Sequence, residues 1–329
     1  MSIPIINVDP LIRRTAGEEH VAKEIRHACC EAGFFYIVGH GVAMTQQQAL
    51  EEAAKQFFAL ESEVKERIAM SLGGIAWRGY FKVGDELTSG KPDLKEGLYF
   101  GTELSAEHPR VKQNVPMHGP NLFPDEVPAL KEAVLDYMSA LTSLGHALMR
   151  GISMSLGLSP DYFKTNFTGN PLTLFRIFRY PPSSPGQFDQ WGVGEHTDYG
   201  LLTILRQDEV GGLQVKSKAG WIDAPPVADA FVCNIGDMLD RITQGFYRST
   251  PHRVLNTSGK ERFSFPFFFD PDFDAPVIPV ISPLIEQRED DVATRWDKSS
   301  VHAFDGTYGE YLLQKVGKVF PDLKDSVIR

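Results

Sequence analysis

The second half of the chain carries the feature that most restricts the fold. From about residue 172 onward, short segments rich in Val, Ile, Leu, Phe and Thr alternate with turn-forming residues. These segments are LTLFRIFRY, LLTILRQ, GGLQVKS, FVCNIG, HRVLNT and RFSFPFFF. Many short strands separated by frequent turn signals favour a barrel or a sandwich over βαβ units. We therefore expect a mainly β fold with flanking helices.

The first part of the chain is mixed. Its pattern predicts a short strand over 3–7, an amphipathic helix over about 17–32 and a strand over 33–39. A further helix is expected to begin at Thr45, because Thr45 and Gln48 have the spacing of a capping box.

The middle of the chain separates this region from the β-rich part. Residues 71–124 are punctuated by Gly and Pro and predict loops with short strands. Apolar residues then recur every three or four positions from Val127 to Leu156, which predicts one long helix. A last helix is expected over 306–321. We divide the chain into a helical or mixed region, 1–124, and a region with the long helix, the β core and the last helix, 125–329, and we expect one compact unit.

Composition narrows the classes of function. The 329 residues are 42% hydrophobic and 23% charged, with a net charge of -10. This charge argues against nucleic acid or an anionic membrane as partner and leaves a small-molecule substrate. The N-terminus lacks the apolar core of a signal peptide, and no apolar run reaches the length of a membrane span. Three cysteines are too few for a disulfide framework, so we expect a cytoplasmic protein with reduced thiols.

Two residues with metal-binding side chains stand at the start of an apolar run, in GEHTDYGLLTIL. On a strand, His196 and Asp198 would point to one face and Thr197 to the other. Such a pair by itself is more often part of a turn. His252, at the head of the segment HRVLNT, adds a third ligand. Two imidazoles and one carboxylate form the facial triad that suits non-haem Fe(II), whereas structural zinc prefers four closed ligands.

A possible carboxylate-binding pair follows the second histidine. In RFSF, Arg262 and Ser264 again lie two positions apart on one strand. The planar guanidinium of arginine, beside a hydroxyl, can hold a carboxylate by two hydrogen bonds. An isolated pair of this kind would be read as surface residues, but its place directly after the triad favours a binding site.

Together these motifs resemble the Fe(II)/2-oxoglutarate-dependent dioxygenases of the isopenicillin N synthase-like family. The resemblance extends beyond the triad and covers nearly the whole chain. It includes IPIINVDPL and EAGFFYIVGHGV near the N-terminus, RGYFKVGDELTSGKPDLKEGLYFG and GPNLFP in the middle, and VCNIGDMLDRITQGFYRSTPHRV before the second histidine.

The resemblance implies a double-stranded β-helix, or jelly-roll, core with the metal at one open end. It implies that the two histidines and the aspartate are the catalytic iron ligands. Arg262 and Ser264 would bind the distal carboxylate of 2-oxoglutarate, and Tyr180 would add a hydrogen bond. The implied reaction couples oxidative decarboxylation of 2-oxoglutarate by O₂ to oxidation of a small substrate, with hydroxylation as the usual outcome.

The chain departs from the family pattern in two places. Many plant members have Asn where this chain has Phe178, and many have QxxTNG where it has DRITQG, residues 240–245. Arg78 lies near the position at which isopenicillin N synthase has an arginine for the substrate carboxylate, although the local alignment is shifted by about one residue. Arg78 is therefore a candidate substrate ligand, with a solvated loop arginine as the alternative. Asn234 is a weaker candidate for the iron pocket.

Other functions remain open on the sequence alone. An Fe(II) oxidase of the isopenicillin N synthase or aminocyclopropane carboxylate oxidase type would keep the same R-x-S motif without using 2-oxoglutarate. On a jelly-roll scaffold, a zinc hydrolase would leave Arg262 and Ser264 unexplained, and the intact triad argues against a non-catalytic binding protein.

Overall fold

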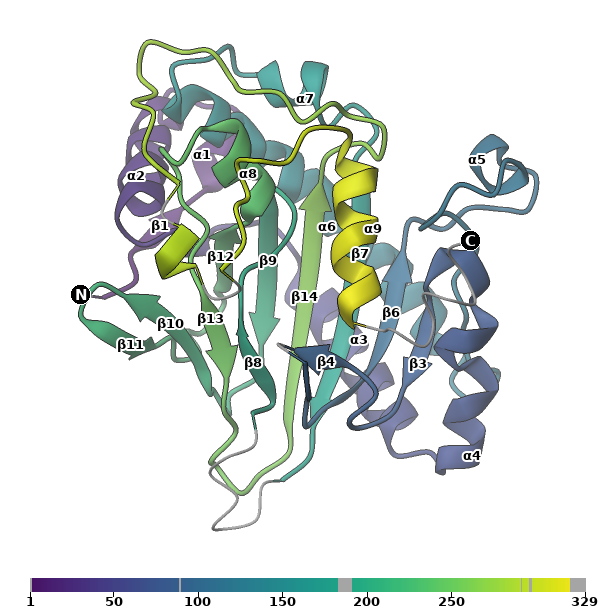
Figure 1. Cartoon of the computed structure of the whole chain (residues 1–329). Coiled ribbons are helices and arrows are strands. Elements are labelled where there is room, and N and C mark those ends of the chain that lie inside the picture. Colours follow the sequence, from purple (N-terminus) through teal and green to yellow (C-terminus); the bar gives the residue numbers. More distant parts are fainter. Residues whose placement is uncertain (1, 89, 183–190, 291, 296–297, 320–329) are drawn as a thin grey trace.

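The computed structural model describes residues 2–88, 90–182, 191–290, 292–295 and 298–319 (Figure 1). Within these residues the strands form an eight-stranded sheet, a four-stranded sheet and a two-stranded ribbon. The large sheet has the order β1 (Ile5–Asn7), β2 (Phe34–Val38), β12 (Phe231–Ile235), β9 (Leu202–Gln207), β14 (Arg262–Asp270), β7 (Leu172–Tyr180), β6 (Glu96–Gly101) and β3 (Gly79–Phe81).

The small sheet supplies the other wall of the β core. Its order is β11 (Gly220–Asp223), β10 (Leu213–Ser217), β13 (His252–Val254) and β8 (Val193–His196), with all pairs antiparallel. The ribbon consists of β4 (Leu87–Thr88) and β5 (Lys91–Pro92). Residues of both sheets line one cavity of about 360 Å³, which lies inside the β core.

Helices cover the far side of the large sheet. The long helix α6 (Ala129–Ser155) contacts β9 and β14 and is itself contacted by α1 (Asp9–Arg13), α2 (Glu18–Glu31), α3 (Met44–Phe58) and α7 (Tyr162–Asn166). The remaining helices are α4 (Ser62–Lys65), α5 (Pro109–Lys112), α8 (Asp237–Ile242) and α9 (Tyr308–Val319), with short 3₁₀ turns at Glu66–Ile68, Met70–Leu72, Gly74–Ala76 and Val292–Thr294.

The alternation of side chains along β7 explains how one strand serves both the core and the cavity. Phe175 points toward α6, where its ring centroid lies 5.4 Å from that of Tyr137. Leu174, Arg176 and Phe178 lie on the opposite face and line the cavity. The same strand therefore supplies Phe175 to the helix-covered side of the sheet and Arg176 to the cavity wall.

The structure agrees with most of the predicted elements and corrects some details. The helix predicted from Thr45 begins at Met44, and its N-cap residue Ala43 makes no side-chain cap, so the capping box is wrong. Helix α8 was missed, because its six residues are too few to show a helical period. The predicted last helix ends at Val319 within the described residues, and positions 320–321 lie outside them.

The N-terminal region is more than a helical cover for the β core. Strands β1, β2, β3 and β6, all from the first 124 residues, belong to the large sheet, and β2 and β6 pair with strands from the later region. In particular, β2 pairs antiparallel with β12, and β6 pairs antiparallel with β7. The two predicted regions therefore share one sheet.

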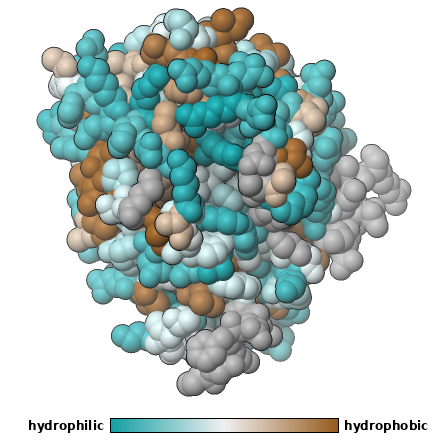
Figure 2. Space-filling model, turned by 60° about the vertical axis from the view of Figure 1, so that its left-hand side comes forward, coloured by the Kyte–Doolittle hydropathy of each residue, from teal (hydrophilic) through white to brown (hydrophobic). Residues whose placement is uncertain are grey.

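The face of the molecule shown in Figure 2 is mainly hydrophilic. On the face shown in Figure 2, hydrophobic residues occur in separate small groups among hydrophilic ones. The large apolar side chains that are exposed come from distant parts of the chain: Ile5, Ile12, Met44, Leu72, Val83, Ile278, Ile281 and Leu284. No helix in the described part of the chain has the length and apolar character needed to cross a membrane.

Candidate metal centre

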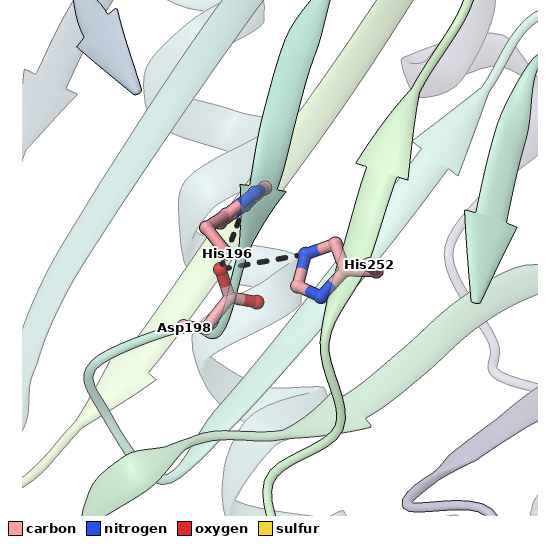
Figure 3. A group of neighbouring side chains, drawn as sticks. All are labelled: His196, Asp198 and His252. Atoms are coloured by element: carbon pink, nitrogen blue, oxygen red, sulfur yellow. Dashed lines mark ion pairs between the residues drawn. The ribbon is translucent and has the colours of Figure 1, made fainter. Parts of the chain in front are cut away.

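The antiparallel pairing of β8 and β13 brings the two predicted histidines together. His196 is the last residue of β8, His252 is the first of β13, and the two are direct partners in the register. Asp198 follows in the turn after β8 and reaches back toward both rings (Figure 3). Thr197, which follows the end of the strand at His196, is also among the residues that line the cavity.

The three side chains direct suitable ligand atoms toward one point. Oδ1 of Asp198 lies 3.8 Å from Nε2 of His196 and 3.7 Å from Nε2 of His252. Nδ1 of His196 lies 2.8 Å from the Gly194 carbonyl, and Nδ1 of His252 lies 3.2 Å from the Thr250 carbonyl. Because a carbonyl only accepts, each Nδ1 carries the proton, and each Nε2 presents its lone pair to the shared point.

The second oxygen of the aspartate is anchored in the large sheet. Oδ2 of Asp198 accepts hydrogen bonds from Thr203 Oγ1 at 2.5 Å and Asn234 Nδ2 at 2.6 Å. Burial raises the pKa of Asp198, but the two histidines and these hydrogen bonds outweigh it and hold the pKa below its usual value. Burial, together with the nearby His196, lowers the pKa of His252 to about 4. One carboxylate and two imidazole nitrogens are the ligand set of a facial triad.

The predicted co-substrate residues lie on the opposite wall of the same cavity. Arg262 on β14 is the direct partner of Tyr180 on β7, and its guanidinium carbon lies 4.6 Å from the centroid of the Tyr180 ring. Ser264 Oγ lies 3.2 Å from the Tyr180 hydroxyl. All three side chains line the cavity.

Arg262 has an unused donor. Its side chain is completely buried, and Nε donates to the Gly211 carbonyl while Nη2 lies 3.5 Å from Gln207 Oε1. Among the residues that the structure describes, Nη1 has no hydrogen-bond partner. A buried donor of this kind is costly unless it is satisfied, and a carboxylate entering the cavity would satisfy it.

The structure does not bring Arg78 to the site. Its side chain is buried outside the cavity lining. Nη1 donates to the carbonyls of Thr102 and Gly119 at 2.9 Å each, and Nη2 donates to the carbonyl of Met117 at 2.9 Å. The guanidinium holds loops together, so neither predicted alternative, a substrate ligand or a solvated loop arginine, describes its position.

Two residues named in the sequence analysis have clear places. Asn234 lines the cavity and supports the aspartate, as described above. Phe178 also lines the cavity, and the Lys95 ammonium lies 4.9 Å from the centroid of its ring. The position at which many plant relatives have Asn is therefore occupied here by an aromatic ring beside a buried cation.

A buried charged group in the cavity wall was missed by the sequence analysis. Lys95 pairs with Asp93 and lies 2.9 Å from Glu86 Oε2, and Arg176 Nη1 lies 4.0 Å from Glu86 Oε1. The segment GKPDLKEG lies in the part predicted to be mostly loops, and LTLFRIFRY gave no sign of which arginine would face inward. Glu86, Lys95 and Arg176 line the cavity, and the pairing of β6 with β7 sets Arg176 opposite Tyr99.

Comparison with known families agrees with this geometry. Residues 3–126 match the family described as non-haem dioxygenase in morphine synthesis, N-terminal, and residues 171–271 match the 2OG-Fe(II) oxygenase superfamily. Among solved structures, a Neurospora crassa protein in complex with alpha-KG is similar, with a TM-score of 0.79, 27% identity and coverage of 96% of both chains.

Curated relatives are similar over almost the full chain. A probable iron/ascorbate oxidoreductase of Dictyostelium discoideum is 52% identical over 94% of this chain and 91% of its own. A 1-aminocyclopropane-1-carboxylate oxidase of Dictyostelium mucoroides is 41% identical, covering 97% and 95%. A homoarginine-6-hydroxylase of Glycine max is 37% identical, covering 98% of each.

The identity over nearly the whole length, the jelly-roll arrangement of two sheets and the His-Asp-His group at the cavity all point the same way. The chain belongs to the isopenicillin N synthase-like family of 2OG-Fe(II) oxygenases and is an Fe(II)/2-oxoglutarate-dependent dioxygenase.

Proposed function

We propose that this enzyme hydroxylates a small organic substrate, with His196, Asp198 and His252 as the iron ligands. Arg262, Ser264 and Tyr180 bind the distal carboxylate of 2-oxoglutarate. One observation carries the assignment: the three residues whose ligand atoms converge and Arg262, whose Nη1 has no partner among the described residues, line the same cavity. The hydroxylase named among the relatives supports hydroxylation as the outcome.

When bound, iron and 2-oxoglutarate supply the oxidising chemistry, and the protein supplies positions. The Nδ1 hydrogen bonds of the two histidines fix their rings, so that both Nε2 atoms stay directed at the metal position. Thr203 and Asn234 hold one oxygen of the aspartate and leave the other for the metal. The completely buried Arg262 neutralises the distal carboxylate.

The metal assignment can be tested by removing one ligand. His196→Ala and Asp198→Ala are expected to abolish iron-dependent formation of succinate from 2-oxoglutarate, because two protein ligands do not hold Fe(II) in a facial site. His20→Ala is the control, since the His20 side chain is 79% exposed and lies on α2, far from β8 in the chain. Full turnover in either ligand variant would contradict the assignment.

A second candidate is an Fe(II) oxidase that does not use 2-oxoglutarate, because one relative at 41% identity is named 1-aminocyclopropane-1-carboxylate oxidase. Anaerobic titration of the Fe(II) protein separates the two functions. A metal-to-ligand charge-transfer band on addition of 2-oxoglutarate supports the dioxygenase. Its absence, with O₂ consumption that does not depend on 2-oxoglutarate, supports the oxidase.

We further propose that the enzyme works in the cytoplasm. Cys29, Cys30 and Cys233 are all free thiols, as expected in a reducing compartment. Burial raises the pKa of Cys29 and Cys233, so these two thiols are packing residues and not nucleophiles. Fractionation with an antibody against the chain would test the location.

A further inference from the structure

A second arginine faces the cavity from the same strand as Tyr180. Arg176 lies on β7, and Leu174, Arg176, Phe178 and Tyr180 share the strand face that lines the cavity. The Arg176 side chain is 14% exposed. It comes from the interior of a central strand, where a charged side chain is rare unless it has a partner.

Arg176 has no hydrogen-bond acceptor of its own in the described part of the chain. Its Nε is buried and without a partner. The nearest carboxylate is that of Glu86, and its Oε1 lies 4.0 Å from Nη1 of Arg176, too far for a hydrogen bond. The Glu86 oxygens already contact the Tyr99 hydroxyl at 2.5 Å and the Lys95 ammonium at 2.9 Å. Among the described residues, the guanidinium therefore has the distant carboxylate of Glu86 as an ion-pair partner but no hydrogen-bond acceptor.

The orientation of this guanidinium is fixed in advance. Its Cζ lies 3.5 Å from the centroid of the Tyr99 ring and 5.2 Å from that of the Phe268 ring. Stacking on an aromatic face holds the plane of the guanidinium and leaves its edge available for hydrogen bonds. A group held in this way loses little entropy when it binds a planar pair of oxygens.

The co-substrate does not account for Arg176. The proposed 2-oxoglutarate carboxylate site is at Arg262, which is the register partner of Tyr180. Arg176 lies four residues before Tyr180 on the strand, which corresponds to roughly 13 Å along β7. A carboxylate bound at Arg262 therefore leaves the second arginine free for another ligand.

We propose that Arg176 binds a carboxylate of the primary substrate, so that the substrate is a small carboxylic acid. This inference rests on the proposed function. The planar fork of Arg176 matches the two oxygens of a carboxylate. Apolar residues that line the same cavity, among them Leu174, Leu205 and Val316, would contact the carbon skeleton of the substrate.

The experiment compares carboxylic acids with their uncharged counterparts. The probes are a library of aliphatic, aromatic and amino acids, each paired with its primary amide, and the readout is succinate formation above the rate without substrate. For the wild type, acids are expected to stimulate turnover and their amides are not. In Arg176→Gln the KM for a stimulating acid is expected to rise by about 30-fold or more, the effect of losing one partner of a buried charge pair. Arg176→Lys should recover part of the loss.

Arg179→Gln is the matched control, because it removes an arginine from the same strand. Arg179 lies on the other face of β7, where it pairs with Glu96 and Glu261. The Arg179→Gln enzyme should prefer acids over their amides to the same extent as the wild type. Retention of this preference in Arg176→Gln would overturn the proposal, as would a wild-type enzyme that no acid stimulates more than its amide.

Failure of this inference is distinguishable from failure of the proposed function. The anaerobic charge-transfer band with 2-oxoglutarate reports on iron and co-substrate, and it should weaken in Arg262→Gln. The same band should keep its dependence on 2-oxoglutarate in Arg176→Gln. If the wild type shows no band, the proposed function fails. If the band is present but Arg176 does not affect the preference for acids, only the inference fails.

Discussion

Asp198 shows how one residue meets two demands. Its Oδ1 faces the two histidines, while its Oδ2 accepts hydrogen bonds from Thr203 and Asn234. The two donors come from neighbouring strands, β9 and β12, so they hold the carboxylate by its outer oxygen. A carboxylate fixed in this way offers one oxygen to a metal without first reorienting.

We therefore expect Thr203→Val to weaken iron binding. The substitution preserves the shape of the side chain and removes the donor to Asp198, and loss of such a supporting hydrogen bond usually reduces metal affinity about 10-fold to 100-fold. The measurement is an anaerobic Fe(II) titration. Thr173→Val is the control, because the buried Thr173 makes a partly buried hydrogen bond at 2.8 Å to Thr102, outside the triad. Equal iron affinity in the two variants would show that the outer hydrogen bond has no effect.

At the scale of elements, the contact between α6 and β14 depends on a glycine. Gly145 of α6 lies beneath Phe269, and a Cβ atom there would approach the ring to 2.4 Å at Cδ2 and 2.7 Å at Cγ. The helix comes close to the sheet because this position has no side chain. The sequence pattern, which weighs glycine only as a poor helix former, does not show this role.

Gly145→Ala is expected to destabilise the protein even though alanine is the better helix former. The gain in helix propensity is about 1 kcal/mol, whereas forcing a methyl group into a packed core typically costs about 1–3 kcal/mol. Urea unfolding measures the net change in the free energy of unfolding from these two effects. Ser143→Ala, at an exposed position on the same helix, should be neutral or slightly stabilising. A more stable Gly145→Ala would mean that β14 and α6 move apart without cost.

A buried carboxyl joins β14 to the last helix. Asp270 accepts a hydrogen bond from the Tyr308 hydroxyl of α9. Burial raises the pKa of Asp270 to about 7 from the usual 3.8, against the lowering effect of the Tyr308 hydrogen bond. The folded protein therefore keeps a proton that the unfolded chain gives up between about pH 4 and pH 7.

The sign of the pH dependence follows from this proton. Because the folded state binds more protons over that interval, Asp270 makes the free energy of unfolding fall as pH rises from about 4 to 7. Asp270→Asn has no titrating carboxyl at this position. As pH rises from about 4 to 7, its free energy of unfolding should therefore increase relative to that of the wild type, by at most about 4 kcal/mol. Urea unfolding at several pH values, with EDTA present, measures the difference. Parallel curves for the two proteins would contradict the prediction.

At the scale of the whole molecule, the proposed ligands connect the two sheets. The histidines belong to β8 and β13 of the small sheet, whereas Arg262 and Tyr180 belong to β14 and β7 of the large one. Iron held by the first sheet and 2-oxoglutarate held by the second would meet in the cavity between them.

Iron and 2-oxoglutarate should therefore stabilise the fold cooperatively. A ligand at 100 times its Kd adds about 2.7 kcal/mol to the free energy of unfolding. We expect the anaerobic rise in Tm with both ligands to exceed the sum of the separate rises, because each ligand completes the site of the other. In Arg262→Gln the excess should disappear. A simple sum in the wild type would show that the two sites are independent.

Local sequence patterns were enough to predict the β-rich core, the long helix and the residue types of the triad. These follow from local patterns: strand and helix periods, and two histidines with a carboxylate at strand ends. The pattern also selected Arg262 and Ser264, because they stand on one strand with a spacing of two. Such features depend on residues that are close together in the chain, so they can be predicted without knowing how the strands and helices pack.

Tertiary structure alone decided which of the remaining charges face the cavity. Nothing in the local sequence distinguishes Arg78 from Arg176. In the structure, the Arg78 guanidinium donates hydrogen bonds to loop carbonyls, whereas Arg176 lines the cavity. The difference arises because β6 pairs with β7 and places Tyr99 opposite Arg176. Pairing between distant strands sets the surroundings of a side chain. No local pattern carries that information, so the triad was predictable and the candidate substrate residue was not.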